Sequence, residues 1–364
     1  MKKIKFLAVA LAAFTMFSCT NDEVENLGNN VPGEQAVLTI KLKGDGDNQA
    51  QSRAAGEALD ADDVTINNYL VFLFREGGAL DCAPHYSASG ATATISNGTT
   101  AAKKAYVVAN TGALANGPFA TVKTEADLLA VAGSLMDDTD NASTQTKTNL
   151  WMSGVKDVTF NGANKGTAAV SLSFVAAKIQ LIVKDNRTGM SGGTIQIEDK
   201  EVVLLFAGQS GKFFGTQKSV QTHFYTGDDS YNNAFNTNVT KSTALSDAVG
   251  AAFTANAGGT VFNHFYTFGN DGTTKPTILA IKSTKTVNSA ASTIYYPVHF
   301  TTADAKETIE PGKSYTVTVT LNGDVEAGAG GGTTDPEAPV ISSSIEVTVT
   351  AAQWVTQPVD KVFN

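Results

Sequence analysis

Apolar and polar side chains alternate along most of the chain from position 36 onward, which is the two-residue period of a β-strand. In the segment 36–43, Leu38, Ile40 and Leu42 fall on one face, while threonine and lysine fall on the other. Similar segments and short apolar runs predict strands at 67–74, 91–96, 104–110, 149–154, 156–160, 168–175, 176–185, 193–206, 260–269, 277–283, 292–300, 314–323 and 345–351. The pattern therefore predicts an all-β fold.

Two segments have the spacing of short helices. Thr124 is a predicted N-cap for a helix over 125–135, because Asp127 follows three residues later and apolar residues follow it. In 243–253, apolar residues recur at every fourth position, which predicts a second short helix.

Glycine-rich segments predict tight connections between strands. The segment 75–78 ends the first apolar run with two glycines, and Asn97-Gly98 predicts a turn before the strand at 104–110. The segment 189–193 matches the letters G-x-S-x-G of a serine nucleophile elbow. That elbow needs a helix after it, whereas a strand is predicted here, so we interpret 189–193 as a hairpin.

The strands form two series that meet near Val175, and each series is long enough for a β-sandwich core of its own. We therefore predict two domains, 54–175 and 176–323. The whole chain has 364 residues and a net charge of -9, which argues against nucleic acid or an anionic membrane surface as a partner.

A linker rich in glycine, alanine, threonine and acidic residues, 324–344, precedes a last strand-like segment, 345–364. Apolar residues take every second position of 345–349, and the alternation slips at 351–352. A β-bulge is predicted there, because it would return Trp354 to the apolar face. A strand on such a linker either folds back onto its own domain or pairs with another molecule.

The N-terminal segment 1–19 has three lysines and an apolar stretch, 6–17, that is too short for a stable membrane anchor. Ser18 then precedes Cys19, so the segment resembles a bacterial lipoprotein signal peptide in which Cys19 is lipidated and becomes the mature N-terminus. An ordinary cleaved secretory signal is the alternative. The residues that follow, up to the strand within 20–53, are polar and acidic and predict a disordered tether.

Few residues suggest a catalytic or metal-binding role. His223 and His264 share similar aromatic surroundings but have no second ligand at strand spacing, and the acidic segment 137–141 lacks the glycine and glutamate of a calcium loop. With Cys19 acylated, Cys82 is the one remaining thiol, so no internal disulfide forms. We therefore predict no catalytic residues, no metal site and no cofactor.

Several segments together resemble the fimbrillins of the Bacteroidales, the subunits of type V pili. They are the signal ending at Cys19, the first strand with Arg53 after it, and the segments 104–110, 174–187, 266–270, 310–323 and 345–354. The resemblance covers nearly the whole chain. It implies two tandem, transthyretin-like β-sandwich domains with one or two short helices, a C-terminal donor strand and a structural rather than enzymatic role.

The resemblance also implies an assembly mechanism. Family members reach the outer membrane and then the cell surface as lipoproteins, and an arginine- or lysine-specific, trypsin-like protease removes the lipid together with the first strand. The groove left behind accepts the C-terminal strand of a neighbouring subunit. The implied residues are Cys19 for lipidation, Arg53 and Ala54 for processing, Leu38, Ile40 and Leu42 in the removable strand, and Ile345, Val347, Val349, Ala351 and Trp354 in the donor strand.

The choice of Arg53 rests on composition. The chain has three arginines, and Arg75 and Arg187 are predicted to lie in a tight turn and a short hairpin, whereas Arg53 follows a polar, flexible segment. The resulting hypothesis is a shaft subunit of an adhesive surface fimbrium, with tip and anchor subunits as further partners. The alternatives are a tip or anchor subunit, or a monomeric glycan-binding lipoprotein.

Overall fold

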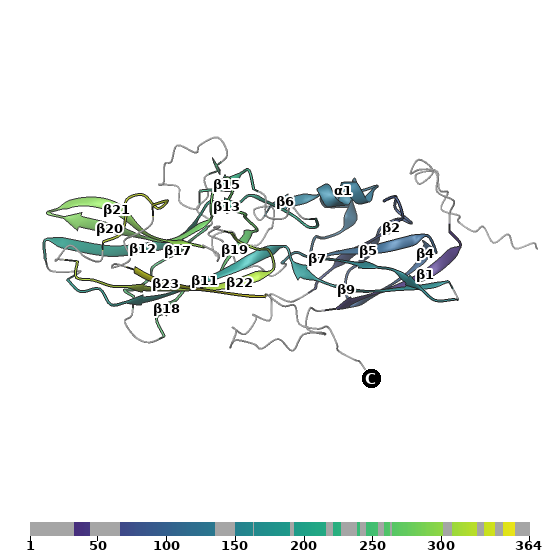
Figure 1. Cartoon of the computed structure of the whole chain (residues 1–364), viewed down its shortest axis with the longest axis horizontal. Coiled ribbons are helices and arrows are strands. Elements are labelled where there is room, and N and C mark those ends of the chain that lie inside the picture. The colour runs from purple at the N-terminus through teal and green to yellow at the C-terminus, as the bar shows by residue number, and fades with distance from the viewer. Residues whose placement is uncertain are drawn as a thin grey trace, which may run out of the picture.

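The structure is a computed structural model that describes residues 33–43, 66–134, 150–162, 164–189, 193–215, 221–226, 239–240, 245–253, 258–262, 264–300, 308–325, 331–338 and 345–353. Over these ranges the chain consists almost entirely of strands, as the hydrophobic pattern predicted. The strands form two β-sandwiches placed end to end along one long axis (Figure 1).

The N-terminal sandwich has two sheets, with strand orders β4-β1-β9-β8 and β10-β7-β5-β2-β3. The first consists of β1 (Gln35–Lys43), β4 (Thr92–Thr99), β8 (Thr159–Phe160) and β9 (Lys165–Ser171). The second consists of β2 (Tyr69–Arg75), β3 (His85–Ser87), β5 (Ala102–Ala109), β7 (Met152–Asp157) and β10 (Ser173–Phe174). Inward-facing side chains of both sheets form one core, which includes Leu38, Val71 and Val107.

The second sheet is covered on its other face as well. Side chains on that face, such as Phe72, pack against the short helix α1 (Glu125–Ala130) and against Phe213, which comes from the C-terminal half of the chain. Because both faces of β2 are covered, Tyr69 to Phe74 are all buried, which explains the continuous apolar run in this strand.

The C-terminal sandwich also has two main sheets, ordered β18-β11-β22-β23, with β19 paired to β11 as well, and β17-β12-β20-β21; β13, β15 and β16 form a small third sheet. The bounds are β11 (Ala176–Asp185), β12 (Ile195–Leu205), β13 (Ala207–Gly208), β15 (Phe224–Tyr225), β16 (Val239–Thr240), β17 (Ser246–Ala248), β18 (Thr260–Val261), β19 (Phe265–Phe268), β20 (Ile278–Val287), β21 (Ala290–His299), β22 (Lys313–Leu321) and β23 (Ile345–Gln353).

The two sandwiches are joined by packing and by backbone pairing. Strand β6 (Ala132–Ser134) pairs with β14 (Ser210–Lys212), so a strand from each half contributes to one small sheet. The Trp151 ring lies 5.3 Å from the Phe213 ring and 6.1 Å from the Phe268 ring, measured between centroids. The Ser153 hydroxyl donates to the Phe213 carbonyl at 2.5 Å. The contact between the halves is therefore apolar and hydrogen-bonded.

Both helix predictions need correction. The first helix ends at Ala130, and 132–134 forms β6 instead. The second helix was wrong: Ser246–Ala248 is the strand β17, paired with β12. Leu245 and Phe253 are buried all the same, one on each side of this short strand along the chain.

The N-terminus of α1 is capped as predicted. The Thr124 hydroxyl accepts from the Asp127 N–H at 3.1 Å, and the Asp127 carboxylate accepts from the Thr124 N–H at 2.9 Å. We expect Thr124→Ala to lower the free energy of unfolding by about 1 kcal/mol, because it leaves a helix N–H without its acceptor. Denaturant unfolding measures this. Thr124→Ser keeps the hydroxyl and is the control, and equal stability of the two variants would contradict the expected role.

Three predicted connections also differ. β4 continues through Asn97 and Gly98 to Thr99, with a bulge opposite β1, so the Asn-Gly pair shapes a strand rather than a turn. β11 and β12 belong to different sheets, so the predicted hairpin at 189–193 is wrong. β22 and β23 pair in regular register, so no bulge interrupts β23 over 345–353.

Candidate functional site

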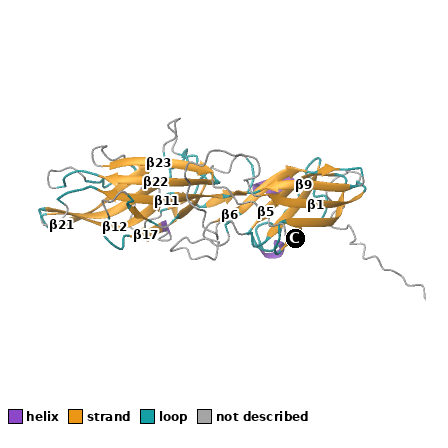
Figure 2. Cartoon of the chain, turned by 90° about the horizontal axis from the view of Figure 1, so that it is seen from below, coloured by secondary structure: helices purple, strands orange, loops and turns teal. Residues whose placement is uncertain are grey.

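Strand β1 lies in the interior of its sheet, not at an edge. It runs antiparallel to β4 on one side and parallel to β9 on the other. Figure 2 shows β1 and β9 side by side. Leu38 and Ile40 are fully buried and Leu42 is 6% exposed, so the face predicted from the sequence points into the core. The removable strand of the hypothesis is thus a central part of the N-terminal sandwich.

Several of the residues beside β1 on the core-facing side are small. Ile40 lies between Ala93 of β4 and Ala168 of β9. Leu38 lies beside Gly166, and a Cβ atom added at Gly98 would come within 2.2 Å of the Leu38 Cδ1 atom. This part of the core is therefore filled by the side chains of β1 itself.

Strand β23 lies at the edge of the C-terminal sandwich, antiparallel to β22. Ile345 is buried against Leu321, but Val347 and Val349 are each 38% exposed. In the single chain, then, the last described strand is folded back onto its own domain. Ala351 pairs with Tyr315 in the same ladder.

Part of the predicted linker 324–344 is bound to the C-terminal sandwich. Thr333 exchanges two backbone hydrogen bonds with Tyr295 of β21, at 2.7 and 2.9 Å. Pro336 is buried, and Glu337 forms an ion pair with Lys275. The residues 331–338 therefore form an additional short segment along the edge of β21.

The two arginines within the described residues are both held by carboxylates. The Arg75 Nε donates to Asp81 Oδ1 at 2.9 Å, and Asp81 also accepts from the backbone and hydroxyl of Thr99 at 2.6 and 2.5 Å. The turn at 75–78 forms as predicted, because the Gly78 N–H donates to the Arg75 carbonyl at 3.0 Å.

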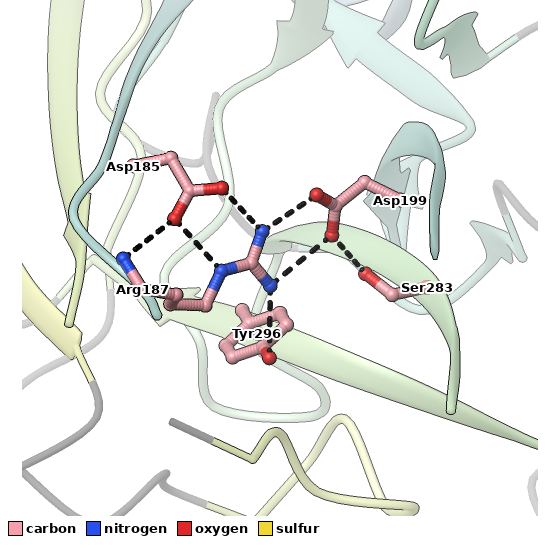
Figure 3. A network of polar contacts seen from close by, with 5 residues as sticks. All are labelled: Asp185, Arg187, Asp199, Ser283 and Tyr296. Atoms are coloured by element: carbon pink, nitrogen blue, oxygen red, sulfur yellow. Dashed lines mark hydrogen bonds and ion pairs between the residues drawn. The ribbon is translucent and has the colours of Figure 1, made fainter. Parts of the chain in front are cut away.

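Arg187 lies inside the C-terminal sandwich, between its two sheets (Figure 3). Its guanidinium donates to Asp185 at 2.8 and 2.9 Å and to Asp199 at 2.6 Å, and its side chain is fully buried. Tyr296 accepts a further hydrogen bond at 3.1 Å, and Ser283 donates to Asp199 at 2.7 Å.

Burial alone would lower the pKa of Arg187, but the hydrogen bonds and charges of Asp185 and Asp199 outweigh it and raise the pKa. This network was missed in the sequence, where we placed Arg187 in a short hairpin. The alternation of β11 ends in Asp185, and a charged residue at a core-facing position is the signal that could have found it.

The predicted lipidation site Cys19, the cleavage site at Arg53 and Ala54, and Trp354 lie outside the described residues. Cys82 is buried, and burial is the main cause that raises the pKa of its thiol to about 12. Within the described ranges, no group of three or more histidine, cysteine, aspartate or glutamate side chains is arranged to hold a metal ion. No helix in these ranges is long and apolar enough to cross a membrane.

Comparison with known proteins accounts for both halves of the chain. Residues 36–201 match the family model of the major fimbrial subunit protein (FimA), and residues 176–354 match that of the C-terminal domain of FimA-like major fimbrial subunit proteins. A crystal structure of a candidate cell adhesion protein from Bacteroides eggerthii is 74% identical in sequence, with a TM-score of 0.82. The match covers 92% of this chain and 100% of that one. The chain belongs to the FimA-like fimbrial subunits.

More distant FimA-like structures share the fold. The fimbrilin FimA of Porphyromonas gingivalis is 18% identical, with a TM-score of 0.63 over 90% of this chain and 99% of that one. A candidate cell adhesion protein from Parabacteroides distasonis is also 18% identical, with a TM-score of 0.57 over 88% of this chain and 99% of that one. The two family matches, together with the relative from Bacteroides eggerthii, make the chain a structural subunit of a cell-surface fimbrium, as the sequence resemblance indicated.

Proposed function

We propose that this FimA-like subunit forms the shaft of the fimbrium and has no enzymatic activity. It is exported as an outer-membrane lipoprotein acylated on Cys19, cut after Arg53, and joined to its neighbours when a C-terminal strand replaces β1. Having both a removable strand and a donor strand favours a shaft role over a tip or anchor role. Its further partners are the tip and anchor subunits of the fimbrium.

The position of β1 carries this proposal. Removal of a central strand leaves the backbone N–H and C=O groups of β4 and β9 that had paired with it without partners. It also exposes the apolar core side chains that lay beneath it. A donated strand restores the hydrogen-bond ladder and covers the exposed apolar core, which is the β-augmentation mode of recognition. A head-to-tail contact of this kind does not close on itself, so it generates a filament.

A donated strand would bind the groove with a large favourable free energy. Each ladder hydrogen bond contributes about 1 kcal/mol net. Each fully buried Leu, Ile or Val side chain contributes about 1.5–3 kcal/mol. Strand β23 has alternate apolar residues over the same length as β1, and Val347 and Val349 are only partly covered where they now lie. Transfer into a groove would bury them more completely.

The burial and ion pairing of the other two arginines support cleavage at Arg53. A protease must bind its substrate as an extended, accessible segment. Arg187 is buried in its network, and Arg75 is tied to Asp81 in a turn, so neither meets that condition. Of the three arginines in the chain, this leaves Arg53.

We expect the mature protein on the native cell surface to begin at Ala54. Mass spectrometry of the N-terminal peptide measures this, and Arg53→Ala is expected to retain acylated Cys19 and to stay monomeric. Lys43→Ala, which removes a basic residue at the end of β1, is the matched control and should be processed normally. Intact acylated Cys19 in all wild-type surface material would refute the processing step and the shaft role with it.

A further inference from the structure

The space that β1 fills is not uniform along its length. The direct partners of Leu38 are Ile95 of β4 and Gly166 of β9. An added Cβ at Gly166 would come 3.1 Å from the Leu38 Cγ atom, and one at Gly98 of β4 would come 2.2 Å from its Cδ1 atom. Beside Ile40 the neighbours on both strands are alanines, and beside Leu42 the neighbour on β9 is Val170. The Leu38 side chain thus lies against glycines of both neighbouring strands, whereas the partners of Ile40 are alanines and the β9 partner of Leu42 is a valine.

The apolar residues of β23 also differ in size along the strand. Ile345 is the largest, and the next two on its face are Val347 and Val349. Cores lose stability when a large side chain is replaced by a small one and a cavity remains, so the larger residue belongs at the glycine-lined position.

Strand β4 also favours one direction for an incoming strand. Its pairing with β1 contains a bulge between the partners of Ala36 and Leu38, and bulges of this kind belong to antiparallel pairs and are rare in parallel ones. A strand that runs in the direction of β1 keeps the antiparallel pairing with β4. A reversed strand would set a parallel ladder against that bulge.

The ends of the molecule favour the same direction. β9 continues through β10 into β11 at the junction of the two sandwiches, and β1 runs parallel to β9, so β1 begins at the outer end of the N-terminal sandwich (Figure 1). β22 runs parallel to β11, so it ends at the outer end of the C-terminal sandwich. A strand that enters in the direction of β1 therefore comes from a molecule lying beyond that end.

We propose that β23 of a second copy enters in the direction of β1 and places Ile345 where Leu38 lies, with Val347 at Ile40 and Val349 at Leu42. This register rests on the strand exchange proposed above and adds the position of each side chain. The sequence has a serine two residues before Ile345, so a small residue falls at the buried position of Ala36.

The competing registers fit less well. In a reversed strand centred on the same slot, Val349 would fall at the glycine-lined Leu38 position and Ile345 beside Val170. In a forward strand shifted by one pair, Val347 would fall at the Leu38 position and Ile345 would replace the buried Ala36, and inserting extra methylenes into a packed core costs stability. Both arrangements leave a cavity at the Leu38 position.

A disulfide test separates these registers. Thr39 of β1 lies directly opposite Thr94 of β4, which is exposed. In the proposed register Glu346 takes the place of Thr39, whereas in both competing registers Thr348 does. Directly opposite residues of an antiparallel pair have Cα atoms about 4.5–5.5 Å apart, which is within reach of a disulfide.

The experiment uses the full chain with Thr94→Cys and Glu346→Cys, cut with an arginine-specific protease, polymerised, oxidised and boiled in SDS without reductant. We expect a covalent ladder from this variant and none from the matched Thr94→Cys, Thr348→Cys variant. Cys82 is buried with its thiol pKa raised to about 12, so it stays protonated and takes no part. A disulfide within one chain is ruled out, since Thr94 and β23 lie in different sandwiches.

The unmodified cut chain is run beside both variants without boiling. If it forms SDS-resistant polymers and the ladder comes from the Thr348 variant, or from neither variant, the register is overturned while strand exchange stands. If the unmodified chain forms no polymer, strand exchange fails and the register fails with it.

Discussion

A chain that ends at residue 344 is expected to fold and to be exported and cut, but to form no polymer. It retains both sandwiches and the β1 slot, and it loses the strand that we propose to fill the slot of the next molecule. The fold survives because, of the β23 side chains described at 345–349, Ile345 alone joins the C-terminal core, which includes 25 other buried residues. SDS-resistant ladders measure the effect, and circular dichroism confirms the fold.

The matched control is the same truncated chain mixed with a synthetic peptide of residues 343–353. The peptide should occupy the slot of cut molecules and stabilise them without linking them, because it carries no sandwich of its own. Polymerisation of the cut wild-type chain should also fall as peptide is added. Normal ladders from the truncated chain would show that the donated segment lies elsewhere in the sequence.

Replacing Arg187 by methionine is expected to lower the free energy of unfolding by about 3–5 kcal/mol. The substitution leaves Asp185 and Asp199 with their charges buried and their main partner gone, although Ser283 still donates to Asp199. Such a loss is a large part of the stability of an ordinary domain. Denaturant unfolding of the cleaved and the uncleaved protein measures it.

The control for Arg187→Met is Lys282→Met, which breaks an ion pair with Glu201 on the neighbouring surface. That pair is partly solvated, so the expected cost is about 0–1 kcal/mol. A variant with Arg187→Met, Asp185→Asn and Asp199→Asn should regain part of the lost stability, because it removes the unpaired charges. If Arg187→Met unfolds at the same denaturant concentration as Lys282→Met, the network does not have the role we assign to it.

Much of the fold follows from local pattern. β11 spans the predicted 176–185, because its core-facing positions alternate over most of its length with positions that are mostly polar. The capping box at Thr124 was predictable because it depends only on residues three apart. The apolar faces of β1 and β23 could be predicted in the same way, because successive side chains of a strand point to opposite faces and give a period of two.

The parts of the fold that the sequence did not predict depend on contacts between segments that are far apart in the chain. The spacing of Leu245 and Phe253 suits both a helix and a strand, and the free edge of β12 decides for a strand. Asn97-Gly98 has the letters of a hairpin turn, but the pairing of β4 with β1 draws it into a bulge. The Arg187 network joins four strands or strand ends from separate parts of the chain, so no local pattern contains it.

The path of the chain between the sandwiches has a mechanical consequence. β9, β10 and β11 follow one another with single residues between them, and both β9 and β11 lie beside a strand that runs parallel to them. A pulling force along the long axis would draw β22 and β11 past each other in shear, since their opposite ends carry the load. All hydrogen bonds of the ladder then resist together instead of opening one by one. In the proposed polymer the donated strand takes the place and direction of β1, so the same geometry holds at β9. Tension along a fimbrium then meets its strongest resistance at these two parallel ladders.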